Sequence, residues 1–201
     1  MQTYKICLLR HGLTRANEEG LYIGRTDLPL SPRGFASLME RKEQHAYPPA
    51  SRFFAPPLSR CRQTLSVLYP DCRIEDAPGL AECDFGEWEG KSASSLQNDP
   101  RFVRWLTGES REIPGGEDAG EFQRRVLGGF GRIVETLMRA GDTEAAVCAP
   151  GGVVSLLMAA LALPRLDMKD WSAENGEGYW VQVTPSLWMR EPVMEFLCAV
   201  P

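Results

Sequence analysis

The chain has 201 residues, of which 43% are hydrophobic and 24% are charged, with a formal net charge of −5. This composition is ordinary for a soluble globular protein, and no apolar run is long enough to span a membrane. The acidic balance argues against nucleic-acid binding, although local arginines could still bind a small anion.

The cysteines and the start of the chain favour a cytoplasmic protein. None of the six cysteines lies in a C-x-x-C pair, and several lie in apolar stretches, so we expect reduced and mostly buried thiols. The first residues run directly into the first predicted strand, so no signal peptide is expected.

The first predicted element is a buried strand, Ile6–Leu9, which ends abruptly at Arg10, His11 and Gly12. Ligands of open α/β sheets bind beyond the carboxyl ends of the strands, and glycine lets the backbone turn close to a ligand. A neutral imidazole can attack phosphorus, while a guanidinium can hold phosphate oxygens through two parallel hydrogen bonds. These residues indicate phosphoryl transfer; the alternative is a histidine that only caps a turn.

A long polar loop and a helix come next. A loop that reaches Asp27 is longer than most connections, which favours a functional role. Ser31 and Pro32 predict the start of a helix that runs to about Gln44. His45 then lies at the end of that helix, at the opposite sheet edge from His11, and is interpreted as a solvated residue without a catalytic role.

Two further short strands are predicted at Arg52–Ala55 and Arg73–Glu75. The first is followed by a helix to about Leu68, which places Arg60 in its first turn, again at the carboxyl end of a strand. An acidic stretch containing Glu82, two aromatic residues and two glycines follows the second strand. A carboxylate beside an apolar wall has a raised pKa and can donate a proton, whereas an acidic surface loop is the commoner alternative.

The remainder of the chain continues the alternation of helices and strands. The pattern predicts helices at 92–107 (broken at Asp99–Pro100), 118–140 and 153–163, and strands at 145–148, 179–183 and 193–198. We therefore expect a single α/β domain over residues 1–201, a three-layer α-β-α sandwich with a mainly parallel central sheet. Residues 85–116 are a candidate helical insertion over the active site.

Several ordered blocks strongly resemble the histidine phosphatase superfamily, the phosphoglycerate-mutase-like proteins. The resemblance extends from about Tyr4 to Leu163 and is closest to the alpha-ribazole-phosphatase-like branch. It is carried by Leu9-Arg10-His11-Gly12 with Thr14 and Asn17, by Gly24-Arg25-Thr26-Asp27, by Pro57-Leu58-Ser59-Arg60, by Glu82 with Asp84-Phe85-Gly86, and by Gly115-Gly116-Glu117.

The resemblance implies a role for each matched residue. His11 would attack the phosphate, and Glu82 would protonate the leaving oxygen and then activate water. Arg10, Arg60, Asn17 and Gly24 would bind the phosphate. One position departs from the family pattern, because Pro150 stands where the family carries a second histidine. Proline has neither a side-chain donor nor a backbone N–H, so one phosphate contact is lost.

The expected function is therefore a phosphomonoesterase for a small phosphorylated metabolite, slow because of Pro150. The alternative is a catalytically impaired member that binds a phosphate ligand or inorganic phosphate for regulation. No cofactor or metal is expected, because arginines would supply the positive charge. Neither nucleic acid nor a membrane is an expected partner, while the apolar tail strands suggest an edge for a homodimer.

Overall fold

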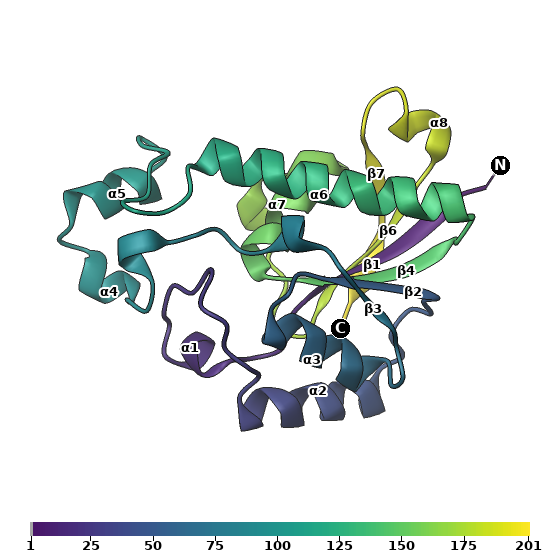
Figure 1. Cartoon of the computed structure of the whole chain (residues 1–201), viewed down its shortest axis with the longest axis horizontal. Coiled ribbons are helices and arrows are strands. Elements are labelled where there is room, and N and C mark those ends of the chain that lie inside the picture. Colours follow the sequence, from purple (N-terminus) through teal and green to yellow (C-terminus); the bar gives the residue numbers. More distant parts are fainter. Residues whose placement is uncertain (1) are drawn as a thin grey trace.

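The computed structural model describes residues 2–201 as an α/β structure built on one seven-stranded sheet (Figure 1). The strands are β1 (Tyr4–Arg10), β2 (Arg52–Ala55), β3 (Ile74–Asp76), β4 (Glu144–Ala149), β5 (Ala162–Leu163), β6 (Gly178–Val183) and β7 (Met194–Val200). The α-helices are α1 (Arg15–Glu18), α2 (Pro32–Gln44), α3 (Ser59–Leu68), α4 (Ala93–Leu96), α5 (Pro100–Leu106), α6 (Ala119–Ala140), α7 (Gly151–Leu161) and α8 (Pro185–Trp188).

The sheet has the strand order β3-β2-β4-β1-β6-β7-β5. Strands β3, β2, β4 and β1 are parallel, β6 is antiparallel to both β1 and β7, and the two-residue β5 is parallel to β7. The prediction of a mainly parallel sheet is confirmed. Since β1 and β4 are parallel neighbours at the centre, their carboxyl ends meet at one edge of the sheet.

Helices cover both faces of the sheet, which explains the uninterrupted apolar run in β1. Ile6 and Leu8 belong to a core packed beneath α6 and α7, whereas Cys7 and Leu9 belong to a second core beside α2 and α3. Successive side chains of a strand point to opposite faces, so a strand buried on both sides carries no polar alternation. The three-layer arrangement follows from this pattern.

Two helix starts occur at the residues that their sequence signals indicate. The Ser31 hydroxyl accepts a hydrogen bond from the Gly34 N–H at the start of α2. Asp118 caps α6 in the same way, and this helix ends at Gly141 in the left-handed conformation, with φ of 76°.

In the middle of α6, Gly129 packs directly against Gly79, where a Cβ atom on either residue would collide with the other's backbone. This close approach brings the loop after β3 against α6.

The structure differs from the predicted elements in three places near the C-terminus. Helix α7 ends at Leu161, and Ala162–Leu163 forms the short strand β5 that the apolar pattern could not separate from the helix. A short helix, α8, occupies the segment predicted as a turn at Pro185. Of the two predicted tail strands, β6 lies inside the sheet, and β7 has an open edge beyond its pairing with β5 at Met194 and Glu195.

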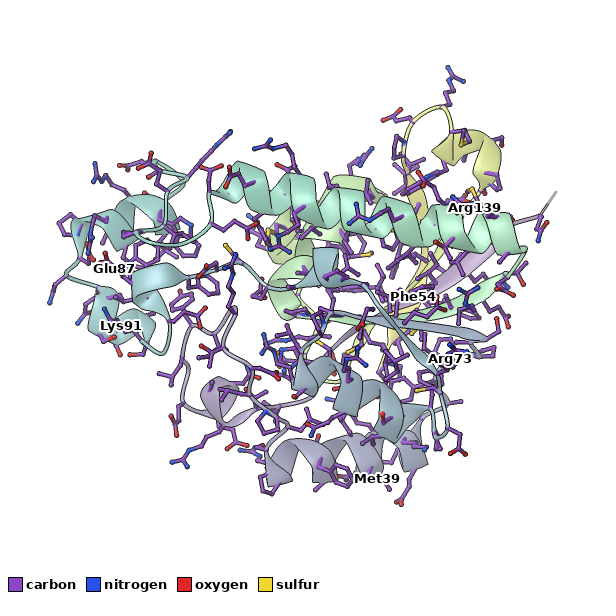
Figure 2. The ribbon with its side chains drawn as sticks, in the orientation of Figure 1. Met39, Phe54, Arg73, Glu87, Lys91 and Arg139 are labelled. Atoms are coloured by element: carbon purple, nitrogen blue, oxygen red, sulfur yellow. The ribbon has the colours of Figure 1, made fainter. Side chains whose placement is uncertain are left out.

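Residues 85–116 form short helices with an aromatic cluster of their own. Asp99 caps α5 by accepting a hydrogen bond from the Arg101 N–H, which accounts for the helix break at this point. Phe122 packs against both this cluster and the core beneath α6 and α7. The cluster contains Cys83, Trp88, Leu96, Phe102 and Ile113, with Tyr22, Phe85 and Trp105 also against it. In Figure 2, Glu87 and Lys91 mark this segment at one end of the molecule, and Arg139 marks the far end of α6. A helical insertion in a single domain remains a prediction.

Within residues 2–201, none of the helices combines the length and the apolar character that a membrane crossing requires.

Candidate active site

The end of β1 is fixed by hydrogen bonds from two directions. The Arg10 N–H donates to the Glu177 carbonyl at 2.8 Å, and the Gly176 N–H donates to the Arg10 carbonyl at 3.1 Å. The His11 N–H donates to the carbonyl of Ala149, the last residue of β4, at 3.1 Å. The backbone of His11 therefore lies at the carboxyl edge of the two central strands, as predicted.

The imidazole of His11 has a defined tautomer. Nδ1 lies 2.7 Å from the Gly12 carbonyl oxygen, which can only accept, so Nδ1 carries the proton and Nε2 keeps its lone pair. The side chain is 4% exposed. Burial, together with the nearby cations Arg60 and Arg10, lowers the pKa of His11 to about 3, against a weaker opposing effect of the Gly12 hydrogen bond. The ring is therefore neutral at physiological pH and can act as a nucleophile.

A buried neutral histidine should make the folded chain lose stability as the pH falls. Between a pKa of 6.5 in the unfolded chain and about 3 in the folded chain, the unfolded state binds one more proton at His11. The free energy of unfolding should therefore decrease as the pH falls below 6.5, by up to about 1.4 kcal/mol per pH unit from this residue. Urea unfolding of the wild type and His11→Gln between pH 6 and pH 4 measures this slope, because titrations shared by both proteins cancel. Equal dependence of the unfolding free energy on pH in the two proteins would contradict the assignment of His11 as a buried neutral histidine.

Two arginines flank this histidine without a carboxylate partner. Arg10 donates from Nη1 to the Ala173 carbonyl at 2.8 Å, and its buried Nε has no hydrogen-bond partner among the described residues. Arg60 is 2% exposed and donates to the carbonyls of Thr26 and Gly24, each at 3.0 Å. Within residues 2–201, neither guanidinium lies within 4.0 Å of a carboxylate oxygen. A buried and a partly buried cation without a carboxylate partner favour the binding of an anion.

Thr64 joins the turn after β1 to the helix that carries Arg60. Its hydroxyl accepts from the Gly12 N–H at 2.9 Å and donates to the Arg60 carbonyl at 2.7 Å. The side chain is fully buried. Thr64 lies one helical turn after Arg60 in α3 and therefore fixes His11 relative to Arg60.

The carboxylate of Glu82 lies against the N-terminus of α7. One oxygen accepts from the Cys83 N–H at 3.0 Å, and the other accepts from the Gly152 N–H at 3.2 Å. Burial raises the pKa of Glu82, although these hydrogen bonds and the cations Arg60 and Arg125 act in the opposite direction. A raised pKa suits a carboxyl group that gives up a proton during a reaction near neutral pH.

Gly24 contacts the site through its carbonyl, which accepts from Arg60 Nη2, while its N–H donates to Glu89 Oε1 at 2.7 Å. A Cβ atom at this position would lie 1.7 Å from the Cys83 carbonyl oxygen, so only glycine fits. Gly24 therefore holds the loop against Arg60, and its own N–H is engaged by a carboxylate in this structure.

Asn17 and the N-cap residue Thr14 form a capping box at the start of α1, in which the Asn17 side-chain oxygen accepts from the N–H and the hydroxyl of Thr14 at 3.1 and 3.0 Å. The same oxygen lies 3.4 Å from Asn175 Nδ2, which also donates to the His11 carbonyl at 2.9 Å. Asn175 ties α1 to the end of β1, a role that residue spacing could not reveal because the two segments are far apart in the chain.

Pro150 follows β4 directly and is the N-cap residue of α7, with φ of −63°. The residue before it accepts the His11 N–H, and the second residue after it binds Glu82. Pro150 therefore lies between the backbone contacts of the two predicted catalytic residues. His45 is exposed at the C-terminus of α2 and takes no part in these contacts.

Hydrogen bonds thus connect Arg10, His11, Arg60, Glu82 and Gly24 to one region at the carboxyl edge of the sheet. Among residues 2–201, no group of three or more histidine, cysteine, aspartate or glutamate side chains is arranged to hold a metal ion. The arrangement provides one neutral nucleophile, two cations and one carboxyl group of raised pKa, which can transfer a phosphoryl group.

Relatives of this chain include phosphatases. The chain is 28% identical over 179 residues to the adenosylcobalamin/alpha-ribazole phosphatase of Salmonella typhimurium, covering 86% of this chain and 87% of that protein. It is 29% identical over 185 residues to the protein of the same name from Escherichia coli, covering 88% and 87%.

Solved structures of the same fold match nearly the whole chain. The alpha-ribazole phosphatase of Shigella flexneri has a TM-score of 0.78 at 24% identity, covering 98% of this chain and 95% of that one. The protein TTHB049 of Thermus thermophilus has a TM-score of 0.70 at 30% identity, covering 98% of both chains. The family model described as "Histidine phosphatase superfamily (branch 1)" matches residues 6–191. The chain belongs to the histidine phosphatase superfamily, branch 1.

Proposed function

We propose that this chain is a phosphomonoesterase that acts on a small phosphorylated metabolite through a phosphohistidine at His11. The observation that carries the proposal is the environment of this side chain. A neutral imidazole with a free Nε2 lies near Arg10 and Arg60, and neither cation has a carboxylate within 4.0 Å in residues 2–201. Membership of a phosphatase family supports the same reaction.

The reaction would take place in two steps. In the first, the lone pair of His11 Nε2 attacks phosphorus, the bond to the leaving oxygen breaks, and Glu82 gives its proton to that oxygen. In the second, water attacks the phosphohistidine and passes a proton to the Glu82 carboxylate, while the N–P bond breaks and inorganic phosphate is released. Arg10 and Arg60 would bind the phosphate oxygens in both steps, with Asn17 and Gly24 at the edge of the site.

The loss of one phosphate donor at Pro150 would slow this reaction. Removal of one preorganised donor to a developing anion costs about 2.7–4 kcal/mol, or roughly a hundred- to a thousandfold in rate. The other groups remain in place, so we expect a slow phosphatase that forms and hydrolyses its intermediate. Pro150 also favours a second candidate function, a regulatory protein that binds a phosphorylated ligand or inorganic phosphate without turnover.

The substrate, location and assembly of the protein are also proposed. Relatives named for alpha-ribazole make its phosphate ester the first compound to test among small phosphomonoesters. All six cysteines are free thiols, which suits the cytoplasm. The open edge of β7, where residues Leu197–Ala199 are exposed, is the candidate site for a homodimer, which light scattering on the purified protein would detect.

Release of inorganic phosphate by the purified chain tests the proposed function. We expect turnover of p-nitrophenyl phosphate and small alkyl phosphates that persists in a chelator such as EDTA, because the arginines supply the positive charge. Binding of phosphate without turnover would instead favour the regulatory alternative. Activity that is lost in chelator and restored by a divalent metal would contradict the proposed mechanism.

Replacement of the proposed acid should depend on the leaving group. We expect Glu82→Gln to impair the cleavage of alkyl phosphates far more than that of p-nitrophenyl phosphate, because nitrophenolate leaves without a proton. Burst kinetics separate the first step from hydrolysis of the intermediate. Equal losses in the first step for both leaving groups would show that Glu82 is not the acid.

A further inference from the structure

The loop that carries Glu82 packs against α6 through Gly79 and Gly129, and it is also hydrogen-bonded to one side chain of that helix, Arg125. Arg125 donates from Nη1 to the carbonyls of Gly79 and Ala81, at 3.0 and 2.9 Å, and from Nη2 to the carbonyl of Glu82 at 3.2 Å. One guanidinium thus holds three carbonyls within four residues of loop. These contacts fix the backbone from which the proposed acid projects.

The same guanidinium is paired with Glu117, which lies before the start of α6. The pair is bidentate, with Nε 2.8 Å from one carboxylate oxygen and Nη2 2.6 Å from the other. The side chains of Arg125 and Glu117 are 29% and 12% exposed. Together with the three loop carbonyls, this pairing gives the Arg125 guanidinium five hydrogen bonds, which fix its orientation. An arginine that only stabilised α6 would not need hydrogen bonds to the loop that carries Glu82.

The pair also changes the electrostatic environment of Glu82. The charged groups that act on this carboxyl are Arg60 from α3 and Arg125 from α6, both of which favour its ionised form. Helix α7 contributes the Gly152 N–H. Burial keeps the thiol of Cys83 neutral, because it raises the pKa of this thiol to about 12. Glu117 offsets the charge of Arg125 without contacting Glu82 itself.

We propose that Arg125 and Glu117 form a positioning pair for the proposed acid: Arg125 holds the Glu82 loop against α6, and Glu117 holds Arg125 in place and offsets its charge. This inference rests on the proposed function, since it assigns Glu82 a proton-transfer role. Neither residue is catalytic, because each acts through Glu82.

The variants separate position from charge. Arg125→Met removes the loop contacts and the cation, and we expect kcat/KM to fall roughly 10- to 100-fold, as expected for a displaced catalytic group. Arg125→Lys keeps the cation and should restore the pH profile but only part of the rate. Glu117→Gln keeps all contacts of Arg125 to the loop. Arg124→Met is the matched control, because the Arg124 side chain is exposed and, within residues 2–201, its one hydrogen bond is to the Gly120 carbonyl of its own helix.

The pH dependence gives opposite predictions for the two members of the pair. Loss of the Arg125 cation raises the pKa of Glu82, so the alkaline limb of kcat/KM should move to higher pH in Arg125→Met. Loss of the Glu117 charge leaves the cation less neutralised and lowers that pKa, so the limb should move to lower pH in Glu117→Gln. A purely structural role would reduce the rate without moving the limb in opposite directions.

A titration that does not depend on turnover keeps the test independent of the proposed function. Carbon-13 NMR of glutamate-labelled protein, with Glu82→Gln for assignment, reports the Glu82 carboxyl directly. Opposite shifts of the Glu82 pKa in Arg125→Met and Glu117→Gln support the positioning pair. If Arg125→Met does not fold, the shift in Glu117→Gln is the deciding result. An unchanged Glu82 titration in the folded variants overturns it. Failure of the proposed function would instead appear as wild-type activity that survives His11→Ala.

Discussion

Replacing His11 with alanine is expected to lower kcat for p-nitrophenyl phosphate by about 10⁴-fold or more, because the chain then has no nucleophile to form the covalent intermediate. The structure places this imidazole at the end of β1 with its Nδ1 bound to the Gly12 carbonyl, so Nε2 is the atom proposed to attack phosphorus. Steady-state assays of the wild type and the variant under identical conditions measure the loss.

The second histidine of the chain provides a matched control. His45 is exposed at the end of α2, and we expect His45→Ala to retain wild-type activity. Circular dichroism and thermal unfolding of both variants separate a lost nucleophile from a lost fold. Substantial activity in folded His11→Ala would contradict the phosphohistidine mechanism and direct attention to another nucleophile.

Replacing Pro150 with histidine is expected to raise kcat by roughly a hundred- to a thousandfold, the reverse of losing one donor to the developing charge. Position 150 lies between Ala149, which binds the His11 N–H, and Gly152, which binds Glu82. An imidazole introduced there would add a hydrogen-bond donor beside both. Comparison of kcat and KM shows whether the gain arises in the transition state or in substrate binding.

Pro150→Ala controls for the change in the backbone. Alanine relaxes the proline constraint and restores the N–H without adding a side-chain donor, so we expect no comparable gain. If Pro150→Ala gained as much activity as Pro150→His, the expected low rate of the wild type would result from the proline backbone at the start of α7 and not from the missing side-chain donor. No gain in folded Pro150→His would mean that the site lacks more than this donor.

The fold and the carboxyl-edge site are predictable because their signals are local. A strand buried on both faces reads as an unbroken apolar run, and β1 follows this rule from Ile6 to Leu9. Ser31 and Pro32 likewise indicate the start of α2, because helix capping depends on a few adjacent residues. With alternating strands and helices, these signals predict the edge at which Arg10, His11 and Arg60 are found.

The contacts that adjust the site join distant segments and therefore carry no spacing signal. The carbonyl of His11 is bound by Asn175, and the loop of Glu82 is held by Arg125, yet neither partner is near in sequence. The N–H of Gly24 donates to Glu89, and the composition of the acidic stretch does not show which of its carboxylates makes this contact. These pairings depend on how separate elements pack, which local patterns do not specify.

The most direct test is to trap the intermediate. The wild type is mixed with excess p-nitrophenyl phosphate, quenched with base within the first turnovers, and digested, and the peptide that contains His11 is analysed by mass spectrometry. We expect one phosphoryl group on this histidine, absent from His11→Ala and removed when the sample is acidified. Turnover in the wild type without any phosphorylated His11 peptide, despite recovery of that peptide, would contradict the proposed mechanism.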